Sequence, residues 1–65
     1  MMYPVTVPCR NIVESMERTE WANERGINIL FRTWEIVVDR QHLTFHFTFH
    51  FENEKDALIF ALVWL

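Results

Sequence analysis

Three histidines are the residues of this chain that most readily suggest metal binding. His46 and His50 lie four residues apart in the segment Leu43–Phe51, and His42 comes just before it. The segment reads as a strand, in which four residues span about 13 Å, whereas each ligand lies about 2 Å from a zinc ion. We therefore expect no metal site within one chain, and a polar, half-solvated face is the favoured interpretation. A metal-dependent assembly would need His46 and His50 of two chains.

Cys9 is the only cysteine, so an internal disulfide and a cysteine-based metal cluster are excluded. It precedes a predicted helix, where the helix dipole can lower the pKa of a thiol. A strand, then Pro8-Cys9 and a helix, resembles glutaredoxin, but Ile12 stands where the second cysteine of that motif would be. We expect an inert thiol rather than redox chemistry.

Other catalytic patterns are missing from the sequence. Gly26 is the only glycine, which excludes phosphate loops and dinucleotide fingerprints. Ser15 is the only serine and falls inside a predicted helix rather than at a nucleophile elbow. A chain of 65 residues also has little room for a ligand cavity of about 300–1,000 Å³. The sequence therefore predicts no catalytic residue, no cofactor and no enzymatic activity.

Length and composition indicate one small domain, residues 1–65. Hydrophobic residues make up 51% of the chain, yet a domain this short buries only about 60% of its unfolded surface, so a partner chain would help to stabilise it. The net charge of −3 argues against a general nucleic-acid binder. The start of the chain lacks a signal-peptide pattern, and the apolar run Ala57–Leu65 is too short to span a bilayer. We expect a cytoplasmic protein without membrane contact.

The segment Leu43–Phe51 is the strand on which the other elements depend. Its apolar and polar residues alternate at every position, which places one set on each face of a strand. The apolar face carries Leu43, Phe45, Phe47, Phe49 and Phe51, and the polar face carries Thr44, His46, Thr48 and His50.

A shorter strand and a helix precede it. Tyr3–Val7 is predicted to be a strand at an edge of the sheet or one that is only partly paired, because Pro4 and Pro8 cannot donate to a ladder. Asn11 and Glu14 form a possible capping box at the start of a helix that Gly26 ends. The candidate core face of this helix is a thin stripe, with Trp21 almost opposite Ile12. It consists of Ile12, Met16, Thr19 and Asn23, flanked by Val13 and Ala22.

The segment Ile27–Val38 is rich in β-branched and aromatic residues and predicts a second long strand. Its apolar residues alternate in two phases, which either a bulge near Arg32-Thr33 or burial on both faces would explain. The polar break Asp39–His42 is short enough for a hairpin. The predicted register sets Val38 opposite Leu43, Ile36 opposite Phe45, Trp34 opposite Phe47 and Glu35 opposite His46.

The last element follows Asn53, a possible helix cap. Ala57–Leu65 contains no polar residue, so we predict a helix that needs cover on nearly every side, with a strand over Phe60–Leu65 as the alternative. The element order is β-α-β-β-α. The predicted fold is an α+β domain of two layers, with an antiparallel hairpin and helices on one face of the sheet.

Two features exceed what a small core requires. Trp21 stands among charged residues and is a candidate anchor for a protein partner, with the alternative that it packs against a loop or the sheet edge. The predicted partner-binding residues are Trp21, Glu17, Arg18 and Glu24. The apolar C-terminus predicts self-association as a homodimer, against the alternative of ordinary core, through Phe60, Val63 and Trp64.

The segment Phe51–Trp64 resembles the end of small accessory proteins of tailed bacteriophages. The similarity consists of an acidic stretch after a strand, followed by Asp56-Ala57, Phe60, Leu62 and Trp64. Val63 departs from the pattern, which often has a basic residue before the tryptophan. The resemblance implies a protein that binds and redirects host machinery, and it carries over no functional residue.

These observations favour a non-enzymatic interaction protein of phage origin that inhibits or modulates a host protein in a bacterial cytoplasm. The alternative is a small nucleic-acid or nucleotide-binding protein that uses the His/Thr face together with Arg32 and Arg40. Its affinity would fall steeply with salt.

Overall fold

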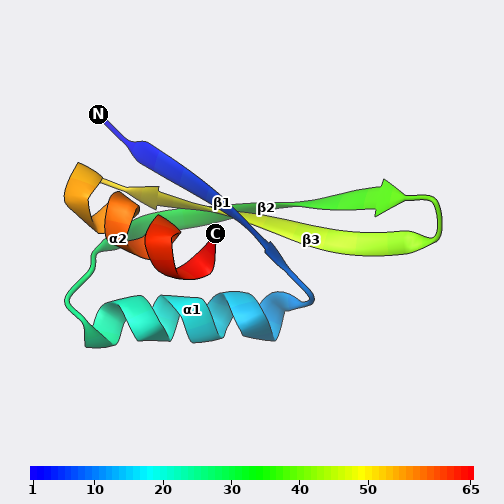
Figure 1. The fold of residues 1–65 in the computed structure, drawn as a ribbon, viewed down its shortest axis with the longest axis horizontal. Helices are drawn as coiled ribbons and strands as arrows, with labels where there is room; N and C mark the ends of the chain where they lie inside the picture. Colours follow the sequence, from blue (N-terminus) through cyan, green and yellow to red (C-terminus); the bar gives the residue numbers. More distant parts are fainter.

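The computed structural model describes residues 1–65 and contains five elements (Figure 1). They are β1 (Tyr3–Cys9), α1 (Ile12–Glu24), β2 (Ile29–Asp39), β3 (His42–Phe51) and α2 (Glu54–Trp64). The α+β class and the β-α-β-β-α order predicted from the sequence are confirmed. The alternative strand over the last residues is wrong, because α2 is helical through Trp64.

The three strands form one antiparallel sheet in the order β1-β3-β2. β3 lies at its centre, and its Phe47, Phe49 and Phe51 are buried on the inner face. The hairpin register is confirmed, with Val38 opposite Leu43 and Glu35 opposite His46. The alternation of apolar and polar residues in β3 therefore predicts both which face of β3 is buried and its register with β2.

The bulge in β2 lies at Leu30 rather than near Arg32-Thr33, because the register shifts between Ile29 and Phe31. The extra residue turns Phe31 to the outer face, where its ring stacks on His50 with centroids 4.3 Å apart. Arg32 consequently points to the inner face and reaches α1. A bulge that re-aims side chains in this way explains the two phases in the sequence.

Both helices pack on the inner face of the sheet. In α2, the ring of Phe60 lies 4.7 Å from Phe49 and 5.1 Å from Phe51, centroid to centroid. From α1, Ser15 meets Arg32 of β2. The outer face of the sheet has no helix against it, as the two-layer prediction requires.

The ends of α1 show why the helix begins and stops where it does. The Glu14 N–H donates to Asn11 Oδ1 at 3.0 Å, while the Glu14 carboxylate accepts from the Arg10 N–H rather than from Asn11 itself. At the other end Gly26 has φ +71°, and Ile27 N–H donates to the Ala22 carbonyl at 2.9 Å. This paired C-terminal pattern is the Schellman motif, which favours glycine at its left-handed position.

The core face predicted for α1 is wrong except at its flank, where Ala22 is buried as expected. Ile12 and Met16 are exposed, whereas Ser15 and Ala22 are buried against the rest of the molecule. These small side chains allow the helix to lie close to the sheet, and Ser15 meets Arg32 there. The helix is therefore turned so that Trp21 reaches α2.

The hairpin is longer than the layer of helices beneath it. Eleven residues of β2 extend about 36 Å, whereas the thirteen residues of α1 extend about 20 Å. Figure 1 shows the β2–β3 hairpin continuing past the end of α1 and past α2. Its inner face in this part is not covered, which leaves four large apolar side chains exposed: Trp34, Ile36, Val38 and Leu43.

Candidate interaction surfaces

Trp21 lies in the seam between the two helices. Its ring meets Trp64 edge-on at 5.6 Å and Phe60 at 6.3 Å, and the Arg25 guanidinium lies 4.4 Å from the ring centre. Trp21 is thus half-buried among α2 side chains. This arrangement is close to the alternative that Trp21 packs within its own chain, although it packs against α2 and not against a loop or the sheet edge.

The other predicted partner-binding residues are divided between this seam and the solvent. Arg18 is nearly covered: its guanidinium stacks over Trp64 at 4.7 Å and pairs with the Glu14 carboxylate at 3.5 Å. Glu17 and Glu24 are exposed, and Glu24 pairs with Arg25 at 3.9 Å. The structure therefore brings Trp21 and Arg18 to the same seam and leaves the two acids outside it.

The predicted self-association residues do not share one surface. Phe60 is 0% exposed and belongs to the core, so the prediction that it takes part in self-association is wrong. Trp64 is half-buried in the seam, and only Val63 is exposed. The all-apolar sequence of α2 hid this difference, because no polar residue marks the side that faces solvent.

The solvent side of α2 carries a ridge of leucines, which we call the α2 ridge: Leu58, Leu62 and Leu65. Leu62 is 84% exposed and is the most exposed large hydrophobic side chain in either helix. Leu58 and Leu65 also border a mostly apolar groove of about 370 Å³ between α2 and β1. A ridge beside a groove on a helix is a shape that another protein can bind.

A second exposed apolar region, the hairpin surface, consists of Trp34, Ile36, Val38 and Leu43. Sequence reasoning missed it because alternation shows which residues share a face but not whether anything covers that face. The flank of α1 that carries Ile12 and Met16 lies on the same side of the sheet, since Met16 and Arg32 line one depression. The signal that could have revealed this surface was the length of the strands relative to the helices.

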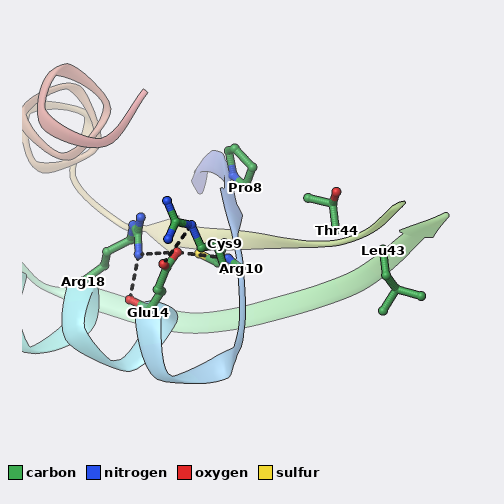
Figure 2. A pocket seen from close by; sticks show the side chains of 7 residues that line it. All are labelled: Pro8, Cys9, Arg10, Glu14, Arg18, Leu43 and Thr44. Carbon is green, nitrogen blue, oxygen red and sulfur yellow. Dashed lines mark hydrogen bonds and ion pairs between the residues drawn. The ribbon is translucent and has the colours of Figure 1, made fainter. Parts of the chain in front are cut away.

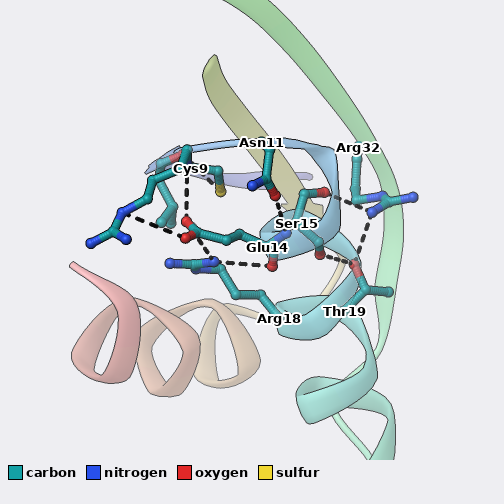
Figure 3. A network of polar contacts seen from close by, with 9 residues as sticks. Cys9, Asn11, Glu14, Ser15, Arg18, Thr19 and Arg32 are labelled. Atoms are coloured by element: carbon teal, nitrogen blue, oxygen red, sulfur yellow. Dashed lines mark hydrogen bonds and ion pairs between the residues drawn. The ribbon is translucent and has the colours of Figure 1, made fainter. Parts of the chain in front are cut away.

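A polar network connects α1 to β2 and marks the start of the hairpin surface (Figure 3). Arg32 Nη1 donates to Ser15 Oγ at 2.7 Å and to Thr19 Oγ1 at 3.2 Å. Thr19 Oγ1 in turn donates to the Ser15 carbonyl at 2.9 Å. No carboxylate pairs with Arg32, so its role here is to satisfy the buried Ser15 hydroxyl.

Cys9 lies beside a shallow depression of about 400 Å³ at the end of β1 (Figure 2). The lining residues are Pro8, Cys9, Arg10, Glu14, Arg18, Leu43 and Thr44. The thiol is buried and lies 3.7 Å from the Val7 carbonyl. Burial raises the pKa of Cys9, the nearby Arg18 opposes that rise, and Glu14 adds to it. The thiol therefore stays protonated at neutral pH, which is unsuited to nucleophilic chemistry.

The outer face of the sheet displays the histidines and threonines. His50 stacks on Phe31 and shares a hydrogen bond of 3.3 Å with the Thr33 hydroxyl. Thr6 and Thr48 bond to each other across β1 and β3 at 2.9 Å. No three His, Cys, Asp or Glu side chains are grouped so that they could hold a metal ion.

No family model matches this chain, and no curated protein or solved structure matches it either. Neither helix is long and apolar enough to cross a lipid bilayer.

Proposed function

We propose that this protein is a non-enzymatic interaction module that binds a bacterial host protein and inhibits or modulates it. The observation that carries the proposal is the α2 ridge, whose leucines are exposed at positions i, i+4 and i+7, two of them in α2 and the third at its C-terminal cap. That spacing is how a helix places its anchors in a hydrophobic groove of a partner. The partner is therefore a protein with an apolar groove able to receive one helix.

The position of the ridge agrees with the resemblance noted in the sequence. The segment Phe51–Trp64, which resembles phage accessory proteins, contains the whole of α2. We place the protein in the cytoplasm of a bacterial host, as a homodimer whose α2 ridges face outward. Trp21 and Arg18 then support α2 from behind, and the exposed Glu17 and Glu24 are free to contribute at the rim.

A single charge on the ridge tests the proposal. Leu62→Lys places an ammonium at the centre of the ridge without disturbing the core, because the side chain is 84% exposed. Tagged wild type and Leu62→Lys would be used to capture proteins from a bacterial lysate, and titration calorimetry would then measure binding of the purified partner. Losing one well-packed leucine and burying a charge should weaken binding about 100-fold.

The matched control adds the same charge elsewhere. Asn23→Lys changes an exposed position of α1, away from the ridge. It should bind the partner as wild type does. Equal binding by Leu62→Lys, or no partner for either protein, would contradict the proposal.

The alternative function, nucleic-acid or nucleotide binding, has one supporting observation. Phe31 stacks on His50 on the uncovered face of the sheet, and stacked aromatics on open sheets can hold unpaired bases. Arg32 does not join this face, because it points to α1 on the other face of the sheet. A fluorescence titration with single-stranded DNA at low salt decides the matter, since this alternative requires binding that weakens steeply as salt is added.

A further inference from the structure

The two edges of the sheet differ in whether another strand can pair with them. β1 carries Pro4 and Pro8, which have no N–H to donate, and such residues block an edge. β2 has no proline, glycine or lysine, and every residue after Ile29 in it is exposed. Its bulge lies at Leu30, near the start, and leaves the register from Phe31 to Asp39 regular. β2 is thus an open edge strand.

We propose that two copies of this protein join through β2, which pairs antiparallel with β2 of the second copy about a two-fold axis at Ile36. This inference rests on the homodimer of the proposed function and gives it an interface. The sheets of the two copies then become one continuous sheet, with all helices on the same side. The hairpin surface is the apolar centre of the interface.

The register follows from the residues of β2. Residues directly opposite in an antiparallel pair point to the same face. With the axis at Ile36, that residue meets its own copy and Trp34 meets Val38, so the apolar side chains on the inner face pair with one another. On the outer face Thr33 meets Asp39. An axis at Glu35 would instead set two carboxylates directly opposite, which is destabilising.

The same two-fold symmetry brings α1 of one copy next to the hairpin surface of the other. Helix α1 of each copy lies under the start of its own β2, as the bonds from Arg32 to Ser15 and Thr19 show. In the antiparallel pair, the start of one β2 lies beside the far end of the other. The α1 flank with Ile12 and Met16 therefore comes next to the hairpin surface of the second copy.

The apolar area that each copy offers to this interface is close to the area that a stable dimer buries. The hairpin surface together with Ile12 and Met16 comprises six side chains that are each about half exposed. At roughly 100 Å² for an aliphatic side chain and more for tryptophan, they offer about 700 Å² per copy. A stable interface buries about 800 Å² on each partner. The added pairing of backbone along β2 supplies the remainder.

Cysteine cross-linking tests the register directly. In the proposed pair the two copies of residue 36 are directly opposite, at about 4.5–5.5 Å between Cα atoms, which lies within the range of about 4.4–6.8 Å for a disulfide. Ile36→Cys should form a covalent dimer rapidly under mild oxidation. Val38→Cys should not, because its copies are about 13 Å apart along the strands. Wild type, with only the buried Cys9, is the background control.

The outcomes separate this interface from the other parts of the proposed function. Cross-linking of Glu35→Cys in place of Ile36→Cys would overturn the register, and cross-linking of neither would overturn the interface. Ile36→Lys should raise the dimer dissociation constant about 100-fold in sedimentation experiments, with an unchanged circular dichroism spectrum. A wild-type monomer would overturn both the dimer and this interface, while binding of a host protein through the α2 ridge would still be tested by Leu62→Lys.

Discussion

Arg40 shows how a single residue limits the stability of the hairpin. It is the only non-glycine residue with a left-handed backbone, at φ +56°, and it begins the turn between Asp39 and His42. A side chain in this conformation costs about 1 kcal/mol relative to glycine. Two-residue hairpin turns favour glycine where φ is positive, so the sequence has an unfavourable residue at this position.

We predict that Arg40→Gly stabilises the protein by about 1 kcal/mol, which corresponds to a rise of about 4–8 °C in Tm for a domain of this size. Scanning calorimetry measures the change. Gln41→Gly is the matched control, because Gln41 has no positive φ to relieve and glycine there only adds freedom to the unfolded chain. A Tm for Arg40→Gly at or below that of wild type would contradict this reading of the turn.

Cys9 makes stability depend on pH in a defined direction. Burial raises the pKa of its thiol, so the folded protein keeps the proton at pH values where the unfolded chain releases it. The free energy of unfolding then falls as the pH rises past 9.0, the ordinary pKa of a cysteine thiol, and does not change with this group below that pH. The helix-dipole argument from the sequence pointed the opposite way, because it did not include burial.

We predict that the free energy of unfolding of wild type falls more steeply above pH 9 than that of Cys9→Ala, with parallel curves below. Urea denaturation followed across this pH range gives both curves. Alkylation of the native thiol should also be slow until the protein unfolds. Rapid alkylation of the native protein at neutral pH would show that the thiol is accessible and reactive after all.

At the scale of elements, the pairing of β2 with β3 was predictable from the sequence, whereas the side of α1 that is buried was not. The register of β2 with β3 follows from strict alternation in Leu43–Phe51, since a slip by one residue would turn every phenylalanine outward. The facing of α1 depends instead on Ser15 and Ala22, whose small size permits close packing. Counting apolar residues on a helical wheel favours Ile12 and Met16, which are exposed.

The seam between α1 and α2 provides the element-scale prediction. Trp21→Ala removes a ring that packs on Phe60 and Trp64, and for a half-buried tryptophan this should cost about 2–3 kcal/mol. Val13→Ala, at an exposed position of the same helix, should change stability by less than about 0.5 kcal/mol. Urea denaturation compares the two. Equal, small costs would mean that the Trp21 ring does not hold the helices together.

At the scale of the whole molecule, the surplus of apolar surface comes from geometry as much as from composition. Seventeen large hydrophobic side chains are exposed, and nine of them lie on the α2 ridge, the hairpin surface and the α1 flank with Ile12 and Met16. The sequence predicted the surplus from chain length and hydrophobic content. It could not predict where the exposed apolar side chains lie, because their location depends on how far a long hairpin extends beyond two short helices.

The most direct test of whether a second copy covers this surplus apolar surface is the solution mass of the wild-type protein, measured by light scattering over a range of micromolar concentrations. We predict twice the mass of one chain, because the proposed β2–β2 dimer would cover the hairpin surface with a second copy. A single-chain mass at every concentration, in a protein that stays folded and soluble with its apolar surfaces open to water, would contradict it.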